Sequence, residues 1–321
     1  MKQVFINLLG ELEALMHMKG QPFRGRAYHK AAESLMNYQK KITKSEELKE
    51  LPNIGPSILK KFKEYEETGK LRILEEAKKN PIYMFTTIFG IGPKKAKKLV
   101  ETEKITTIEQ LRERQEDVLN NVQKKGLKYF EDVQLRIPRN EINKFKIRLG
   151  EIFNNLKNID GSSFEIVGSY RRGNTESGDI DIIITNNKNN KKVFAEFLIS
   201  LVKAGLLVEI FSKGKTKSLT IGKIENCPCR RLDFLYTPPK EYPFAILYFT
   251  GSKAFNVVMR AHSLKLGYSM NEHGFHIMND KKKGKRLDKF FTTEKSIFEF
   301  LKIVYKKPHE RIDGRALVSL Q

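Results

Sequence analysis

The stretch that decides the fold is GSYRRG at residues 168–173, followed by SGDID at residues 177–181. Residues 164–167 predict a short strand that runs into the Gly-Ser turn, and residues 179–184 predict a second strand. Because side chains alternate along a strand, Asp179 and Asp181 are expected on the same face, a few ångströms apart. Two carboxylates held that close repel each other, and a bound cation relieves the repulsion.

Oxygen ligands of this kind suit Mg²⁺ and the phosphates that Mg²⁺ carries. The Gly-Ser turn offers backbone N–H groups to an anion, and Arg172 can bind a phosphate through two N–H donors of its guanidinium. A phosphate-binding turn followed by paired metal ligands is typical of a nucleotidyltransferase palm. The alternative is a solvated Asp-x-Asp at a strand edge, which the preceding Gly-Ser turn makes the weaker interpretation.

Asp233 is the natural third carboxylate, because it lies in the strand-like run 231–236 between apolar neighbours. An unpaired charge would be costly there. Its alternative role is a salt bridge to Arg231, which is two positions away and therefore on the same strand face. Spacing alone does not decide between the two, but the presence of Asp179 and Asp181 favours the metal-ligand interpretation.

The composition predicts a globular protein with a polyanionic partner. A chain of 321 residues exceeds one average domain, and 40% hydrophobic residues are enough for packed cores. The net charge of +22 and the pI near 9.7 predict binding driven by phosphate neutralisation and counterion release. A protein that only coats nucleic acid would share this charge, so the charge does not by itself imply catalysis.

Cysteines and hydropathy indicate the compartment. Cys227 and Cys229 have no second pair to complete a zinc site, which predicts free thiols in a reducing environment. No apolar run approaches the length of a membrane span, and no signal peptide is recognisable. The expectation is a soluble, intracellular protein.

The first 76 residues have helical spacing of apolar residues, and a turn motif then occurs twice. LPNIGPSILKKF at residues 51–62 and IFGIGPKKAKK at residues 88–98 share Ile-Gly-Pro at an offset of 37 residues. Each glycine turn would expose amides at a helix N-terminus, which suits a DNA backbone phosphate. We interpret the pair as helix-hairpin-helix motifs that bind DNA largely independently of sequence, with mere surface αα-turns as the alternative.

The rest of the chain predicts alternating helices and strands. Helices are expected at 104–135, 141–156 and 193–204, and strands near 207–211, 218–221 and 231–236. The aromatic pair in YFTGS at residues 248–252 could pack under a nucleotide, or it could form a buried corner. The basic run 281–286 predicts a solvated hairpin loop near DNA.

Four motifs together resemble the family X DNA polymerases, of the polymerase-beta type, in order and in spacing: LKYF at 127–130, GSYRRG, SGDID and YFTGS. The resemblance implies a multidomain α + α/β protein. Its parts would be a helical lyase-like domain with the first helix-hairpin-helix (1–76), a helical DNA-binding subdomain with the second (77–140), a nucleotidyltransferase palm with a mixed β-sheet (141–240) and a nucleotide-selecting α/β subdomain (241–321).

The resemblance also implies the roles of individual residues. Asp179, Asp181 and Asp233 would hold two Mg²⁺ ions, with Mn²⁺ as a substitute. Nucleotide contacts would come from Arg136, Ser169, Arg172, Gly178, Tyr248, Phe249, Gly251 and Asn256. DNA contacts would come from Arg24, Lys60, Lys94, Lys95, Arg231, Arg260 and Glu272. Backbone carbonyls of Lys49, Leu51 and Ile54, and of Thr86, Ile88 and Ile91, would bind a monovalent cation, Na⁺ or K⁺, at each hairpin.

The activity implied is DNA-directed DNA synthesis that fills short gaps during base excision repair. The expected partners are gapped or nicked duplex DNA and a dNTP, with no membrane, and the protein is expected to be a monomer in the nucleus or another DNA-containing compartment. Lys61 matches the Schiff-base lysine of a 5′-deoxyribose-phosphate lyase, with Lys60 and Arg24 as cationic neighbours. No BRCT-like extension precedes the lyase-like region, which favours the members of the family that lack one.

Some positions depart from the family pattern. Ser57 and Ile73 stand where lysines grip the 5′-phosphate in the lyase pocket, and Lys253 and Val257 replace residues beside the base pair. A template-independent nucleotidyltransferase uses the same palm and stays open as an alternative, although the hairpins and YFTGS argue against it. The third class is a non-catalytic DNA-end-binding protein, which the three carboxylates disfavour.

Overall fold

The computed structural model describes residues 1–157, 159–280 and 282–320 and divides the chain into two compact units, Met1–Phe130 and Glu131–Gln321. No helix among those residues is both long enough and apolar enough to cross a bilayer. The four-part division expected from the sequence is finer than these two units and stays a prediction.

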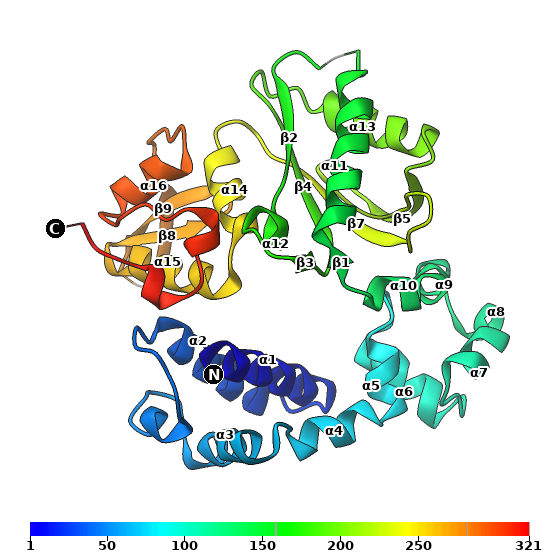
Figure 1. Ribbon diagram of the computed structural model, residues 1–321, viewed down its shortest axis with the longest axis vertical. Coiled ribbons are helices and arrows are strands. Elements are labelled where there is room, and N and C mark those ends of the chain that lie inside the picture. The colour runs from blue at the N-terminus through cyan, green and yellow to red at the C-terminus, as the bar shows by residue number, and fades with distance from the viewer. Residues whose placement is uncertain (158, 281, 321) are drawn as a thin grey trace. The chain divides into compact units, whose positions relative to one another are not determined.

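The first unit is helical (Figure 1). Its helices are α1 (Lys2–Met18), α2 (Pro22–Asn37), the short 3₁₀ helix η1 (Ser45–Leu48), α3 (Pro56–Thr68), α4 (Arg72–Lys78), α5 (Pro81–Thr86), α6 (Pro93–Glu101), α7 (Ile108–Glu113), α8 (Gln115–Val118), α9 (Asn121–Lys128) and α10 (Phe130–Gln134), which ends in the second unit. Their apolar faces form the core, and the ring of Phe5 in α1 stacks on Phe62 in α3 with centroids 4.0 Å apart. Helix does not run throughout the first 76 residues as the sequence suggested. Only η1 is helical between Asn37 and Pro56, where Pro52 and Gly55 disfavour helix.

The second unit combines sheets and helices. In chain order it contains β1 (Ile137–Pro138), α11 (Arg139–Asn154), β2 (Ser162–Ile166), α12 (Gly168–Arg171), β3 (Glu176–Ser177), β4 (Ile180–Asn186), α13 (Lys192–Lys203), β5 (Leu207–Lys213), β6 (Lys217–Gly222), β7 (Arg230–Tyr236), α14 (Tyr242–Thr250), α15 (Lys253–Lys265), β8 (Tyr268–Asn271), β9 (Gly274–Asn279), β10 (Lys282–Arg286), α16 (Glu294–Phe300) and the 3₁₀ turns η2 (Pro308–Glu310) and η3 (Gly314–Ala316). The mixed sheet and flanking helices confirm the expected fold class.

The main sheet has the strand order β2-β4-β7-β6-β5, in which β4 and β7 are parallel and the other pairs antiparallel. Alternation along the strands separates its two faces. On β4, Ile180, Ile182 and Ile184 pack into the core that α11 and α13 cover, as do Leu232 and Phe234 on β7. The residues between them therefore project from the opposite face.

The C-terminal part of the second unit packs α14, α15 and α16 with the antiparallel sheet β10-β9-β8. Its core is rich in aromatic rings, and Phe244, Phe275 and Phe291 meet pairwise at centroid distances of 5.1 to 5.5 Å. Of the basic run 281–286 expected to be a loop, residue 281 lies outside the described residues. Residues 282–286 form the strand β10 instead, because the edge of β9 supplies hydrogen-bonding partners for their backbone.

Candidate active site and nucleic-acid interface

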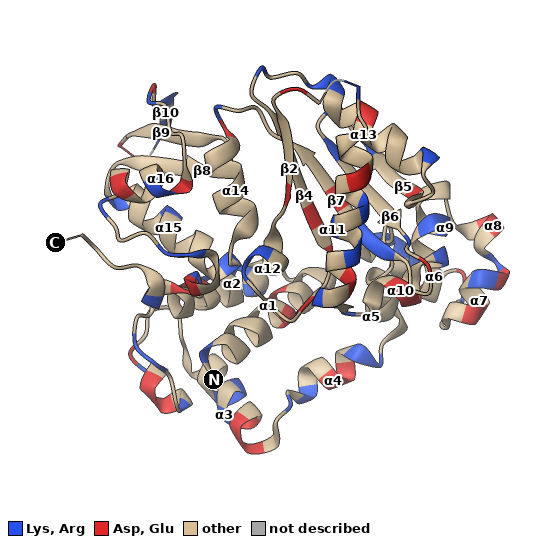
Figure 2. Ribbon diagram, turned by 45° about the horizontal axis from the view of Figure 1, so that its top comes forward, with Lys and Arg blue, Asp and Glu red and all other residues tan. Residues whose placement is uncertain are grey.

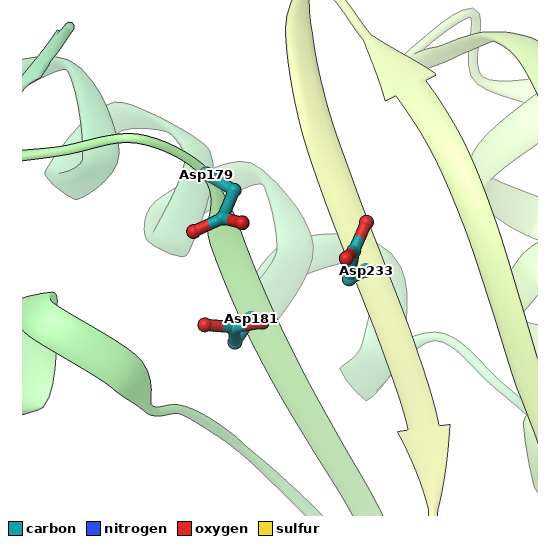
Figure 3. Close-up of side chains that lie close together, drawn as sticks. All are labelled: Asp179, Asp181 and Asp233. Carbon is teal, nitrogen blue, oxygen red and sulfur yellow. The ribbon is translucent and has the colours of Figure 1, made fainter. Parts of the chain in front are cut away.

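The parallel register of β4 and β7 creates the carboxylate cluster. Asp181 is paired directly with Asp233 in the ladder, and Asp179 lies just before β4 begins. Asp181 and Asp233 project from the sheet face that α11 and α13 do not cover, and Figure 3 shows Asp179 beside them at the start of β4. One carboxylate oxygen from each lies within 4.8 Å of the others. The sequence predicted this cluster of side chains, and the structure brings them together.

Burial makes the cluster electrostatically unfavourable without a counterion. Desolvation, together with the charge of Asp233, raises the pKa of Asp181 to about 6. The pKa of Asp233 is also raised by burial, although the Arg231 guanidinium opposes that shift. The buried Oδ1 of Asp233 has no hydrogen-bond partner. Three hard oxygen donors with an unsatisfied buried atom fit a divalent cation.

Arg231 provides part of the missing positive charge. Its Nη2 pairs with Asp179, and its Nε lies 3.5 Å from Asp233 Oδ1 without forming a hydrogen bond. The salt-bridge alternative considered for Asp233 is therefore present in this arrangement. It does not exclude the metal-ligand interpretation, since one guanidinium leaves the pKa of both Asp181 and Asp233 above its ordinary value.

Gly168 allows the turn that holds the expected phosphate-binding residues to approach the carboxylates. Its φ is +61°, and a Cβ at this position would lie 2.5 Å from Asp181 Oδ2. The turn continues as α12, where Ser169 Oγ donates a hydrogen bond to Ser177 Oγ at 2.7 Å. A residue with a side chain at 168 would displace the Asp181 carboxylate, so the glycine fixes both the turn and the cluster.

Two expected phosphate-binding arginines border the cluster. Arg172 is half-buried, and its Nη1 donates to the backbone oxygen of Thr250 at 2.6 Å. Arg136 pairs with Glu176, with Nε 2.9 Å from Oε1, and its guanidinium lies beside Gly178. Both side chains thus already have protein partners, which the sequence did not indicate.

The remaining expected nucleotide contacts lie around the end of α14. The rings of Tyr248 and Phe249 meet edge to face at 5.2 Å. Asn256 Nδ2 donates a hydrogen bond to the backbone carbonyl oxygen of Tyr248 at 2.6 Å, which connects α15 to α14. Gly251 follows α14 at φ +69°, beside the Arg172 guanidinium. These four residues are therefore close to one another, and Gly251 is also beside Arg172.

Arg260 and Glu272 are separate from this group. Arg260 is exposed on α15, and Glu272 lies in the β8–β9 turn, 3.8 Å from His273 Nε2. Neither belongs to the carboxylate cluster among the described residues. Their template-side role stays a prediction.

A buried ion network beside the site was missed. Arg171 pairs with Glu165 on β2 and with Glu294 at the start of α16, which also binds the fully buried Arg311. Arg171 Nη1 further donates to Thr250 Oγ1. The network joins the main sheet to the C-terminal part of the second unit. Glu294 lies 123 residues from Arg171, so no local pattern could have indicated the pair.

The two hairpins share one backbone geometry at the offset of 37 residues. Asn53 and Gly90 both adopt positive φ, of 65° and 83°. Gly55 and Gly92 cap the next helices with φ, ψ of −84°, 171° and −85°, 172°. The sequence repeat is therefore a structural repeat, whose helices α3 and α6 both begin at proline.

The carbonyls expected to bind a monovalent cation lie in these turns. Leu51 O accepts a hydrogen bond from Ile54 N at 3.1 Å, and Ile88 O accepts one from Ile91 N at the same distance. Lys49 follows η1, and Thr86 is the last residue of α5. A carbonyl oxygen with one hydrogen bond keeps a second lone pair, so these bonds are compatible with cation binding.

The expected DNA-binding lysines differ in exposure. Lys60 and Lys94 are exposed, whereas Lys95 is half-buried and donates to the Val118 carbonyl. Lys61 is also half-buried on α3, with Nζ 3.5 Å from Ser57 Oγ. Arg24 is exposed on α2 and bonds to Gln21. Lys60 and Arg24 stay predicted neighbours of the Lys61 amine, because no contact among the described residues joins them to it.

Four family models match successive parts of the chain. They are described as a helix-hairpin-helix domain (residues 1–71), the fingers domain of DNA polymerase lambda (83–134), the DNA polymerase beta palm (136–239) and the DNA polymerase beta thumb (245–312). Together they account for most of the sequence, and their order is the order in which the motifs occur.

Curated relatives agree with these matches. The chain is 31% identical to DNA polymerase lambda of Arabidopsis thaliana, 29% identical to DNA polymerase lambda of Rattus norvegicus and 27% identical to the DNA polymerase type-X family protein pol4 of Schizosaccharomyces pombe. These alignments cover 95%, 95% and 97% of this chain but only 61%, 56% and 65% of the relatives. The resemblance inferred from the motifs is confirmed: the chain belongs to the family X DNA polymerases.

Proposed function

We propose that this chain is a DNA-directed DNA polymerase that fills short gaps in duplex DNA by nucleotidyl transfer from a dNTP. The observation that carries the proposal is the cluster of Asp179, Asp181 and Asp233, whose buried unpartnered oxygen and raised pKa values fit divalent cations. The duplicated hairpins and the charge of +22 support a DNA substrate.

In this proposal Asp181 and Asp233 hold one Mg²⁺, Asp179 and Asp181 hold a second, and Mn²⁺ can replace either. When bound, such ions lower the pKa of the primer 3′-hydroxyl and neutralise charge on the triphosphate. Asp233 is the proton acceptor in this proposal, because it would be the carboxylate nearest to that hydroxyl.

Other residues of the chain orient the nucleotide. Ser169, Arg172 and the amides of the Gly168 turn bind the triphosphate, with Arg136 and Gly178 beside them. Tyr248, Phe249, Gly251 and Asn256 line the sugar and base pocket, and Arg260 and Glu272 align the template. Arg172 keeps further N–H donors for the triphosphate beside its bond to the Thr250 carbonyl, and that bond links the phosphate-binding side chain to the end of α14.

A single-turnover assay on a one-nucleotide gap, with Mg²⁺ and each dNTP in turn, tests the proposal. Incorporation should follow the template base, and Asp233→Ala should reduce it by several orders of magnitude without weakening DNA binding. Addition that ignores the template would favour a template-independent transferase. DNA binding without incorporation by the wild type would favour a non-catalytic end-binding protein.

We further propose that the chain works in base excision repair, as a monomer in a DNA-containing compartment, with Na⁺ or K⁺ at the hairpins. Lys61 would remove a 5′-deoxyribose phosphate through a Schiff base, and its place on α3, directly after the first hairpin, supports this assignment. Borohydride should trap the wild type on such an end. Lys61→Ala should abolish the adduct and spare gap filling, whereas exposed Lys60→Ala should only weaken trapping. No adduct with the wild type would refute the assignment.

A further inference from the structure

A second charged surface lies away from the carboxylate cluster, on β10 and the segment that follows it. Five of the eight residues 282–289 are Lys or Arg, and only Asp288 is acidic. Lys282, Lys283 and Lys285 are exposed, and none of them forms an ion pair with a carboxylate among the described residues. Figure 2 shows blue, basic segments on the hairpin of β9 and β10. None of the residues expected to bind metal or nucleotide lies on β10.

The backbone holds these lysines in fixed positions. β10 pairs with β9 from Lys282 to Arg286, and a bulge falls between Lys283 and Arg286. At the bulge, a Cβ on Gly284 would lie 2.8 Å from the oxygen of Ile277, so only glycine allows the close approach of the two strands. Gly284, which interrupts the basic run, is therefore required by the pairing of the two strands. The lysines form an ordered row of charge along an edge strand.

An aromatic cavity of about 250 Å³ adjoins the row. Lys240, Arg286 and Lys289 supply its positive charge against the single carboxylate of Asp288, and Phe244, Phe290 and Phe291 supply much of its apolar wall. Phe290 lines this cavity and is 64% exposed, so its ring is accessible to a ligand. The Lys289 ammonium lies 4.9 Å from the centre of the Phe300 ring, so it is held over the aromatic cluster.

Arg286 contributes to the shape of the cavity more than to its free charge. Its Nη1 lies 3.3 Å from Glu241 Oε1, and its Nη2 donates to the His273 oxygen at 2.7 Å. The guanidinium is thereby fixed at the cavity wall. The lysines of β10, Lys240 and Lys289 remain cations available to an anionic ligand.

We propose that this surface, formed by β10, Lys289, Phe290 and the adjoining cavity, binds a single-stranded segment of polynucleotide. Phosphates lie along the lysine row, and one unpaired base stacks on Phe290 at the mouth of the cavity. Stacking on an exposed ring requires a base that is not paired, which distinguishes a single strand from a duplex. Lysines on an edge strand also prevent pairing with other chains. That role requires neither the exposed Phe290 nor the cavity beside it.

Fluorescence anisotropy with the intact chain tests the proposal, using an oligothymidylate and an abasic oligonucleotide of the same length. The wild type should bind the oligothymidylate more tightly. Phe290→Ala should weaken that binding roughly fivefold to a hundredfold and remove the preference, since stacking is worth about that much per base. Phe290→Trp should keep the preference, which controls for misfolding. Equal affinity for both strands, or an unchanged Phe290→Ala variant, would overturn the proposal.

Charge is tested separately. Replacing Lys282, Lys283 and Lys285 by Glu should make the plot of log affinity against log salt concentration shallower by about 2. Each phosphate contact on a single strand contributes roughly 0.7 to that slope, and three contacts would be lost. The matched control reverses Lys188, Lys191 and Lys192, which are exposed on the same unit and change the net charge equally. Equal losses in the two variants would show general electrostatics and contradict a site.

Photocrosslinking with 4-thiothymidine should map to residues 282–290, and its absence there would also overturn the proposal. The inference rests on the proposed function only in the choice of DNA as ligand. The two can fail separately, because gap filling without a single-stranded extension should be unchanged in all these variants. If the wild type incorporates no nucleotide, the proposed function fails while the binding test still stands.

Discussion

Replacing Gly168 by Ala should impair catalysis without removing any chemical group. The new Cβ would lie 2.5 Å from Asp181 Oδ2, whereas ordinary contact begins near 3.4 Å. The carboxylate or the turn must therefore move by roughly 1 Å, and a misplacement of that size can reduce a rate by about a hundredfold. The φ of +61° adds strain of about 1 kcal/mol or more to the folded state.

Gly173→Ala is the matched control for this prediction. Gly173 also has positive φ, +85°, but its added Cβ would meet only His309 Cβ, at 4.0 Å. It should share the loss of stability in urea unfolding while keeping nucleotide incorporation near the wild-type rate.

Single-turnover incorporation across an Mg²⁺ titration separates the two variants. Gly168→Ala should need more Mg²⁺ and incorporate about a hundredfold more slowly, with unchanged affinity for gapped DNA. Incorporation by Gly168→Ala at the wild-type rate would refute the reasoning. So would an equal loss in Gly173→Ala, because strain alone would then account for the effect.

Three further predictions concern stability and binding. Without divalent ions, Asp181 keeps its proton up to about pH 6 in the folded state but only to 3.8 when unfolded, so its contribution to stability falls as pH rises through that window. The free energy of unfolding of Asp181→Asn should therefore rise relative to that of the wild type by up to about 3 kcal/mol between pH 4 and pH 7. Urea unfolding in EDTA measures this difference, and a difference that does not change with pH would contradict the prediction. Glu141→Ala should lower the free energy of unfolding by about 3–5 kcal/mol, because it leaves the buried Arg230 guanidinium without its carboxylate. Glu151→Ala, on the exposed side of the same helix, should lower it by less than about 1 kcal/mol in the same measurement. Lys94→Ala should reduce the salt slope of DNA binding by about 1, and Lys95→Ala should chiefly destabilise the fold; equal slopes for both would count against this difference.

The sequence was most informative where the chemistry is local. Alternation along one strand was enough to predict that Asp179 and Asp181 share a face, and a fixed offset was enough to identify the hairpin repeat. The position of Asp233 could not be predicted from one strand alone. The register that places it beside Asp181 depends on pairing between strands 52 residues apart. Its apolar strand-like surroundings made it a candidate without supplying that register.

Long-range partners were not predictable. Lys95 and Lys94 look alike in sequence, yet Lys95 turns inward to a carbonyl 23 residues away. The ion network around Arg171 depends on Glu294, which no periodicity connects to it. The basic run before Phe290 suggested a loop because lysine and glycine have low strand propensity, and tertiary pairing with β9 overrode that preference.

The duplicated turn gives its two copies different freedom to vary. In the first, the left-handed position holds Asn53, an exposed residue whose side chain reaches Ser34. In the second, a Cβ on Gly90 would lie 3.2 Å from the Val122 side chain, because α9 packs over the turn and Gln123 bonds to the Gly90 oxygen. One backbone shape thus permits sequence drift in one copy and restricts it in the other. Mutations of equal size at equivalent positions would then have unequal effects, although the local geometry that they perturb is the same.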